Sequence, residues 1–377
     1  QKKIGRGVFI MVFSQYGSIF SVIMFSLLLI PAVFMNLYGK RIKYYGMLLN
    51  IPMLMFLLGT KTLQMFQFLI FIVCELILIY GYLFFKIKTE NNWLYYFVMA
   101  SSMLPIILIK LCVYTQYDML GFVGISYISF RIWQLIVEIH DGHIEQLNIL
   151  DMLYFVTFFP TLSSGPIDRY QRFLEDLDKV IARNEYVEYY LLEGLARIGK
   201  GMVYKFGIAF MINQYIMVPL PEEHTLWSTI VYMYAYTLYL FFDFAGYSHF
   251  AIGTSYILGI KVGENFNKPF LAHNMKEFWE RWHISLSQWF GDYIYKRFVL
   301  NALRHKVFKS RKMASRAGNM VTMFVMGVWH GPYLYYILYG FYEGAALVVT
   351  DIYLKSKVFR KFKKMKCYEL VSRIVCF

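Results

Sequence analysis

His330 is the side chain best placed for acid–base chemistry. It follows Met320–Trp329, a run without a charged residue, and it precedes Gly331 and Pro332. A helix that stops at Gly-Pro inside an apolar environment exposes its backbone and leaves room beside the imidazole. A neutral imidazole accepts a proton near pH 7, and a general base typically contributes about 10²–10⁴ in rate. We therefore expect His330 to act as a general base, with a buried hydrogen-bonded histidine as the alternative.

His283 is the second candidate. It lies in Phe278–Phe298, a segment that holds eight aromatic residues among several charged ones. That mixture is typical of a helix at headgroup depth in a membrane rather than of one that crosses it. His283 lies four residues after Trp279, so we expect both on one helix face, with nearby tryptophans shielding the imidazole from water. His283 is predicted either to assist His330 or to be structural.

A basic segment follows between Lys296 and Arg316, where eight Lys and Arg residues occur without an Asp or Glu. Its apolar residues recur at helical spacing, which predicts a basic amphipathic helix over Val299–Arg311 at the cytoplasmic face. Such a helix either adsorbs to anionic lipid or docks an acidic protein, which the basic rim would steer. Arg311 or Lys312 is suited to bind a phosphate by charge-assisted hydrogen bonds. The expected docking residues are Val299, Leu300, Leu303, Arg304, Arg311 and Lys312.

The composition indicates the scaffold that positions these residues. The chain of 377 residues is 58% hydrophobic and 16% charged, whereas globular domains average roughly 25% charged residues. Apolar runs long enough for helices of about 20 residues recur along the sequence. We therefore predict an all-α polytopic membrane protein that forms a single domain over residues 1–377, with a catalytic and docking core at 276–331.

The distribution of Lys and Arg residues determines the expected orientation of the chain in the membrane. Lys and Arg accumulate in cytoplasmic loops, which accounts for the net charge of +14 without nucleic-acid binding. We predict about nine to eleven transmembrane helices, an external N-terminus, a cytoplasmic C-terminus and additional interfacial helices. The first apolar run is expected to be a retained span rather than a cleaved signal peptide. The expected spans include the second half of Val8–Leu37, then Tyr45–Leu58, Met65–Phe85, Leu94–Tyr114, Met119–Val137, Gly201–Val218 and Leu226–Phe244.

Two further segments are not expected to cross the membrane. Leu150–Ile167 contains Pro160 and a Ser-Ser-Gly-Pro sequence, which predicts a broken, re-entrant element of the kind tolerated where protein surrounds it. Glu175–Arg197 is polar and predicts one amphipathic helix on the cytoplasmic side. Charged residues in or near apolar runs are expected to face the interior as ion pairs or caps, with direct substrate contact as the alternative. These residues are Glu75, Arg131, Glu138 and Asp243.

Several sequence blocks resemble those of the membrane-bound O-acyltransferase superfamily, and they occur in order along the chain. They are Phe158–Thr161 with Ser164–Ile167, Tyr239–Ser248, Glu264–Pro269, Phe278–Ser287 (F-W-x-R-W-H-x-S-L-S) and Val328–Gly331 (W-H-G). The resemblance implies that His330 is the catalytic residue. It also implies a ring of helices around a central funnel, with His330 where the openings from the two membrane faces meet.

Within the superfamily, the compact size and the Asp292–Phe298 continuation are most similar to members that attach D-alanine to teichoic acids. That similarity implies an acidic carrier protein on the cytoplasmic side, which brings D-alanine as a thioester of phosphopantetheine. It further implies a lipoteichoic acid hydroxyl as acceptor on the outer side, and an extracellular or membrane-anchored accessory protein is a further expected partner. Gly291 departs from the pattern, which has an arginine before the Asp-Tyr pair, so no charge-dependent role is assigned there.

No cofactor of the protein's own is expected, because the phosphopantetheine arm would arrive with the carrier. The four cysteines form no C-x-x-C pattern, so we predict neither a disulfide nor a metal site. Whether the acyl group passes directly or through an acyl-histidine intermediate stays open at this point.

Two other functions remain as alternatives. The first is a polysaccharide O-acetyltransferase of the same superfamily, which would use an acetyl donor. The second is a transporter or flippase in which a buried histidine and buried acids relay protons. A transporter predicts inverted repeats with paired broken helices, and the sequence shows no clear internal repeat. Binding of an acidic acyl-carrier protein discriminates, since a transporter has no need of one.

Overall fold

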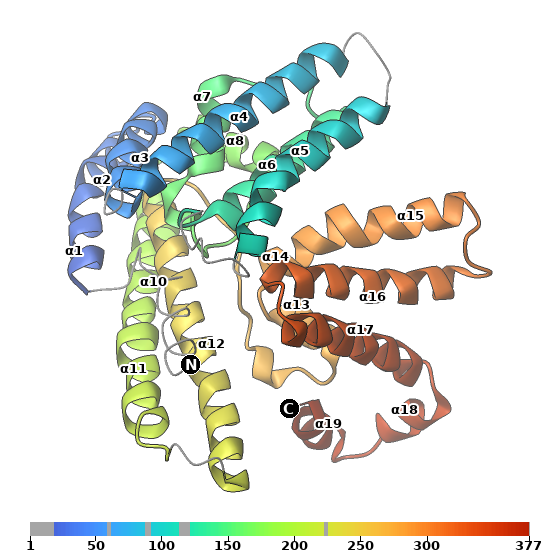
Figure 1. Cartoon of the computed structure of the whole chain (residues 1–377). Coiled ribbons are helices and arrows are strands. Elements are labelled where there is room, and N and C mark those ends of the chain that lie inside the picture. The colour runs from blue at the N-terminus through green and yellow to red at the C-terminus, as the bar shows by residue number, and fades with distance from the viewer. Residues whose placement is uncertain (1–18, 59–61, 87–91, 113–120, 222–224, 377) are drawn as a thin grey trace. The chain divides into compact units, whose positions relative to one another are not determined.

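The computed structural model describes residues 19–58, 62–86, 92–112, 121–221 and 225–376. Within these ranges the chain forms helices and no strands, apart from one isolated antiparallel bridge between Phe266 and Trp282 (Figure 1). The all-α fold class is therefore confirmed for this part of the chain. The protein divides into two compact units. The first comprises Gln1–Ile109 and Tyr117–Gly263, and the second comprises Lys110–Gln116 and Glu264–Phe377.

Three helices in the described ranges are long and apolar enough to cross a membrane. They are α4 (Thr62–Lys86), α5 (Asn92–Leu111) and α17 (Leu334–Leu354). α4 and α5 agree with predicted spans. Shorter apolar helices form α1 (Ile19–Leu28), α2 (Ile30–Leu37) and α3 (Lys43–Leu58). The first part of the predicted span Val8–Leu37 lies outside the described residues. The same holds for the start of Met119–Val137, whose later part forms α6 (Ile125–His140).

The first unit contains a broken helix at its core. α7 (Ile149–Thr157) is capped at its N-terminus by Asn148, whose side-chain oxygen accepts hydrogen bonds from two backbone N–H groups of the first turn. The helix ends before Pro160, and a single 3-10 turn follows. Arg131 in α6 is 1% exposed and donates to backbone carbonyls at this break. These carbonyls belong to Phe155, Val156 and Thr161. Since buried carbonyls require donors, both the break and the capping role of Arg131 are confirmed.

The other interior charges differ from one another. Asp243 forms an ion pair with Lys205, and both side chains are largely buried, which confirms the expected internal pairing. Glu75 in α4 is 3% exposed and forms no ion pair with the described residues. Glu138 in α6 is half-buried. The expectation of an internal pair or cap therefore holds for Asp243 and Arg131 and stays a prediction for Glu75 and Glu138.

α12 (Leu226–Ile257) is longer than the predicted span Leu226–Phe244 and continues for 32 residues. Its second half packs closely against α10 (Glu193–Met202). A Cβ atom at Gly253 would lie 2.5 Å from the carbonyl oxygen of Gly194. Small residues that let helix backbones approach closely are typical of membrane helix packing. The small and polar residues beyond Phe244 extend the helix because they are buried in this contact.

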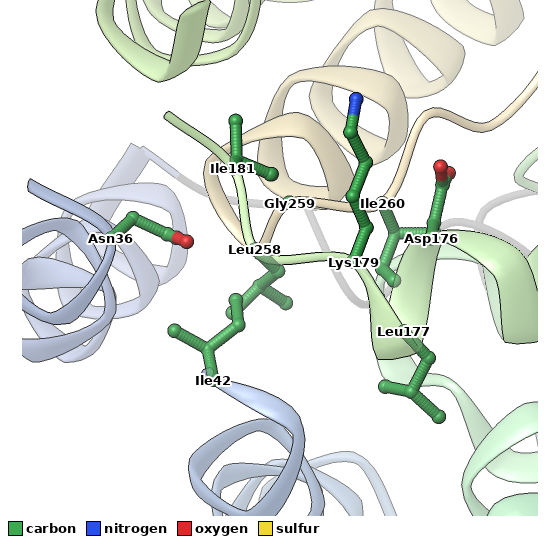
Figure 2. Close-up of a pocket in the computed structure, with 9 residues that line it drawn as sticks. All are labelled: Asn36, Ile42, Asp176, Leu177, Lys179, Ile181, Leu258, Gly259 and Ile260. Atoms are coloured by element: carbon green, nitrogen blue, oxygen red, sulfur yellow. The ribbon is translucent and has the colours of Figure 1, made fainter. Parts of the chain in front are cut away.

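The polar segment Glu175–Arg197 is not one helix, contrary to the prediction. α8 (Tyr170–Asp178) ends within it, residues 179–182 are not helical, and α9 starts at Arg183. In the last turn of α8, the Asp176 carboxylate accepts a 2.7 Å bond from the backbone N–H of Lys261, a residue distant in sequence. Figure 2 shows Asp176 and Lys179 beside a hollow of about 10 Å³. That volume suits a single water at most, so the hollow is no substrate site.

A second helical run follows the non-helical residues 179–182. It starts at Arg183, well before Gly201, where the predicted span Gly201–Val218 begins. It contains α9 (Arg183–Tyr186), α10 and α11 (Phe210–Ile212). π-helical turns separate and follow these elements, at Val187–Leu192, Val203–Ala209 and Asn213–Met217. The run continues to residue 217 and therefore joins the end of the predicted polar helix to the predicted span Gly201–Val218.

The second unit carries the segments that the sequence singled out for chemistry. Its helices in order are α13 (Met275–Arg281), α14 (Ile284–Phe290), α15 (Lys296–Arg304), α16 (Arg311–His330), α17, α18 (Lys357–Phe362) and α19 (Tyr368–Cys376). A π-helical turn, Gly291–Tyr295, joins α14 to α15. α15 and α16 form a hairpin, and α16 packs along α17 (Figure 1). Residues 276–331, the expected catalytic and docking core, all lie in this unit.

Candidate active site

His330 is the last residue of α16, as the Gly-Pro sequence after it indicated. Its imidazole lies among aromatic rings: the ring centroid of Trp329 is 4.7 Å away, that of Tyr336 is 5.8 Å away and that of Tyr339 is 6.1 Å away. The Tyr336 ring is stacked at 21° to the imidazole. His330 is nevertheless exposed. Surface exposure at this position suits access by a reactant, and the general-base role of His330 and its alternative both stay predictions.

Glycines in α16 and α17 hold the two helices close enough to place His330 against the tyrosines. A Cβ atom at Gly327 would lie 2.5 Å from the Tyr336 carbonyl oxygen, and one at Gly340 would lie 2.6 Å from that of Met323. A Cβ atom at Gly331 would lie 2.7 Å from the Tyr336 ring itself. Any larger residue would push these elements apart. The glycine contacts therefore set the distance between His330 and the ring stacked on it.

His283 does not share a helix face with Trp279, contrary to the prediction. α13 ends at Arg281, and His283 has a φ angle of 43°, in the left-handed region, at the start of α14. Trp279 instead donates from its indole nitrogen to the carboxylate of Glu343 in α17, at 3.1 Å. His283 is 6% exposed, so the expected shielding from water is present.

Asn265 and its neighbours fix the turn that carries His283. The backbone N–H of Ile284 donates to the Asn265 carbonyl oxygen at 2.9 Å, and the Ser285 hydroxyl donates to the Asn265 side-chain oxygen at 2.6 Å. The N–H of Asn267 donates to the Arg281 carbonyl oxygen at 2.9 Å. Asn265 is fully buried. No role was predicted for Asn265, although it lies in the Glu264–Pro269 block that resembles a block of the acyltransferase superfamily.

The two histidines interact electrostatically. Burial lowers the pKa of His283, and the proximity of His330 lowers it further. His283 is therefore neutral at physiological pH and can donate from one ring nitrogen and accept at the other. The structure brings together the two histidines that the sequence singled out, one accessible and one enclosed.

The expected docking residues do not lie on one helix. α15 ends at Arg304, and α16 starts at Arg311 behind Ser310, whose hydroxyl accepts a bond from the N–H of Met313. An N-terminal cap of this kind begins a new helix, so the predicted helix Val299–Arg311 is wrong. Leu300 is 66% exposed. Of the other predicted docking residues, Val299 and Leu303 are half-buried, and Arg304, Arg311 and Lys312 are exposed.

Comparisons with known proteins identify the family of the chain. The family model described as MBOAT, membrane-bound O-acyltransferase family, matches residues 106–375. The chain belongs to this family and is an acyltransferase of the membrane.

Individual relatives narrow the similarity. The chain is 39% identical over 376 residues to the teichoic acid D-alanyltransferase of Bacillus subtilis (strain 168), over 97% of this chain and 95% of that protein. It is 38% identical to the teichoic acid D-alanyltransferase of Streptococcus thermophilus, over 91% of this chain and 84% of that protein. It is also 33% identical over 232 residues to a probable alginate O-acetylase of Pseudomonas aeruginosa, over 60% of this chain and 42% of that protein.

Proposed function

We propose that this protein transfers D-alanine from a phosphopantetheine thioester, carried by a small acidic protein, to hydroxyl groups of lipoteichoic acid. The observation that carries the proposal is the accessible His330 at the end of α16, within a chain similar along nearly its whole length to teichoic acid D-alanyltransferases. An exposed imidazole among aromatic rings is suited to a general base.

The reaction needs one proton acceptor and no resident cofactor. The His330 imidazole takes the proton of the acceptor hydroxyl, and the oxygen attacks the thioester carbonyl. The tetrahedral intermediate then collapses, an ester bond to D-alanine forms, and the phosphopantetheine sulfur leaves. The imidazolium returns its proton to that thiolate, so the histidine ends neutral and charge balances. Direct transfer of this kind requires no acyl-enzyme.

His283 has a supporting part in this proposal. It is buried and neutral beside His330, so it can donate a hydrogen bond without adding positive charge. We assign it to orienting His330 or polarising the reacting groups. The turn held by Asn265 keeps it in place.

The carrier is proposed to dock at the turn between α15 and α16. Leu300 offers an exposed apolar contact on α15, and Arg304, Arg311 and Lys312 supply exposed positive charge at the end of α15 and the start of α16. Opposite charge raises the rate of encounter and fixes orientation. In this arrangement about nine to eleven crossings form a ring around a funnel, with the N-terminus outside and the docking face cytoplasmic. Lipoteichoic acid approaches from the outer side, with an accessory protein outside or anchored in the membrane.

The decisive experiment uses purified His330→Ala and His330→Gln proteins, carrier loaded with radiolabelled D-alanine, and lipoteichoic acid. Label transfer is expected to fall by about 10²–10⁴-fold, while carrier affinity stays at the wild-type value. His143→Ala, at an exposed histidine of the first unit, is the matched control and should transfer normally. Full transfer by both His330 variants would refute the mechanism.

Similarity to alginate O-acetylases supports a second candidate, O-acetylation of a polysaccharide. The same assay discriminates when an acetyl donor replaces the loaded carrier. Acetyl transfer without any response to the D-alanyl carrier would favour the second candidate. Absence of transfer from both the D-alanyl carrier and the acetyl donor would favour the alternative of a transporter or flippase.

A further inference from the structure

The C-terminal end of α16 can accept hydrogen bonds from donors outside the helix. The last four carbonyls of a helix have no N–H partner inside it, and the common C-terminal motifs recruit the N–H groups of the next two residues. Here the N–H of Gly331 donates to Gly327 at a long 3.4 Å. Pro332 has no N–H at all. A donor from another segment can therefore stabilise the turn that carries His330.

Lys110 provides that donor. Its ammonium group donates to the backbone carbonyl of Trp329, the residue before His330. The same ammonium lies 5.7 Å from the centre of the Trp329 ring. Lys110 is half-buried and belongs to the same compact unit as α16. A cation at a helix C-terminus interacts favourably with the helix dipole, and a cation over an indole ring is attracted to its face.

We propose that Lys110 is a positioning residue for His330. It closes the last turn of α16 through the Trp329 carbonyl and holds the Trp329 ring, so that the imidazole keeps its orientation against Tyr336. Lys110 touches neither reactant in this role. The consequence for transfer rests on the proposed function of His330, whereas the capping contact itself does not.

The first unit contains a matched contact that serves as a control. Lys86, the last residue of α4, donates to the backbone carbonyl of Ile139. Ile139 is the next-to-last residue of α6, and a histidine, His140, ends that helix. The chemistry of the two contacts is the same: a lysine near the end of an apolar helix caps the carbonyl that precedes a helix-terminal histidine. Only the Lys110 contact adjoins His330.

The test compares Lys110→Met, Lys110→Arg and Lys86→Met in the full-length protein reconstituted in lipid nanodiscs. Three quantities are measured: the turnover number and carrier KM of D-alanyl transfer, the unfolding temperature, and the rate at which diethyl pyrocarbonate modifies His330 at pH 8. The modification is followed by peptide mass spectrometry, with the exposed His143 as internal reference. This labelling needs no substrate.

Lys110→Met is expected to lower the turnover number by about 10–100-fold with the carrier KM unchanged. The His330 labelling rate should rise by about threefold as the turn loosens. Lys110→Arg retains a donor and a charge and should restore most of both values. Lys86→Met should leave the His330 labelling rate at the wild-type value even where it lowers the unfolding temperature.

Two outcomes would overturn the inference: wild-type labelling and turnover in Lys110→Met, or an equal change in both by Lys86→Met. If the wild-type protein transfers no D-alanine but the labelling pattern is as expected, the proposed function fails and the positioning role of Lys110 stands.

Discussion

At the scale of single residues, the two histidines differ mainly in their surroundings. His330 is exposed at a helix end among aromatic rings, and His283 is buried in a turn with a positive φ angle. A positive φ is uncommon for a residue with a side chain, although histidine adopts it more readily than most. Such a conformation persists only where surrounding contacts impose it. Asn265 and Asn267 supply those contacts through the bonds to the His283 turn.

Replacement of Asn265 by Ala should therefore affect transfer more than stability. The variant loses the hydrogen bond from Ser285, which costs about 1 kcal/mol of stability, and it loosens His283. We expect transfer to fall by about 10–100-fold in the radiolabel assay. Asn50→Ala is the matched control, because Asn50 is also a buried amide bonded to a hydroxyl, that of Thr157, at 2.8 Å. An equal loss of transfer in both variants would contradict a specific role for Asn265.

The local structure predicted from the sequence is correct for His330, which ends a helix, and wrong for His283, which lies in a turn rather than within a helix. The end of α16 at His330 follows from Gly331 and Pro332, which are local signals. The turn at His283 forms backbone bonds with residues 265 and 267: the N–H of Ile284 donates to the Asn265 carbonyl oxygen, and the N–H of Asn267 donates to that of Arg281. Helical periodicity does not reveal such distant partners. The four-residue spacing between Trp279 and His283 therefore predicted a shared helix face that the structure does not have.

At the scale of elements, close packing of α16 and α17 positions the site. The helices meet at Gly327, Gly340 and Gly344, where added Cβ atoms would lie within 3.0 Å of the opposite helix. Membrane helices associate through this kind of close approach because lipid supplies little hydrophobic driving force between them. α16 is thus held against α17 by shape complementarity at glycines.

Gly340→Ala should destabilise the protein, because its Cβ atom would meet the backbone carbonyl of Met323 at 2.6 Å. Overpacking of this kind costs about 1–3 kcal/mol. Gly199→Ala is the control, since a Cβ atom there has no neighbour within 4 Å, and a helical Gly→Ala change should stabilise by about 0.5–1 kcal/mol. The unfolding temperatures in detergent should therefore move in opposite directions. Equal shifts would refute the packing argument.

Element boundaries were the least predictable part of the fold. The apolar helices α3, α4 and α5 agree with predicted spans because hydropathy and length define them. The polar helices do not, since Ser310 begins a new helix within the basic segment and Asp176 binds the distant Lys261 backbone. Near each of these helix boundaries, a short polar side chain accepts a hydrogen bond from a backbone N–H group.

At the scale of the whole molecule, positive charge is the feature most relevant to partners. The net charge is +14, and exposed basic residues occur both at the α15–α16 turn and in the segment 355–366. Salt screens charges separated by more than about 10 Å at 0.1 M ionic strength. Binding of an acidic carrier should therefore weaken as salt increases.

Two triple variants identify which basic residues contribute to carrier binding. Neutralising Arg304, Arg311 and Lys312 with Gln should weaken carrier binding by about tenfold, since an exposed ion pair contributes up to about 1 kcal/mol, and should flatten the salt dependence. Neutralising Lys361, Lys363 and Lys364 removes the same charge from the C-terminal segment. Calorimetric titration should show near wild-type affinity for this second variant. Equal weakening by both triples would argue against docking at the α15–α16 turn.

The hydrogen bond between the Trp279 indole and the Glu343 carboxylate has a consequence for assembly. Apolar helix faces are nearly equivalent from one turn to the next, so a shift of one turn, about 5.4 Å, changes their contact area little. A single buried polar pair is satisfied in only one such register. The bond between the Trp279 indole and the Glu343 carboxylate therefore favours one register of α13 along α17, and the position of the His283 turn, which follows α13, depends on that register.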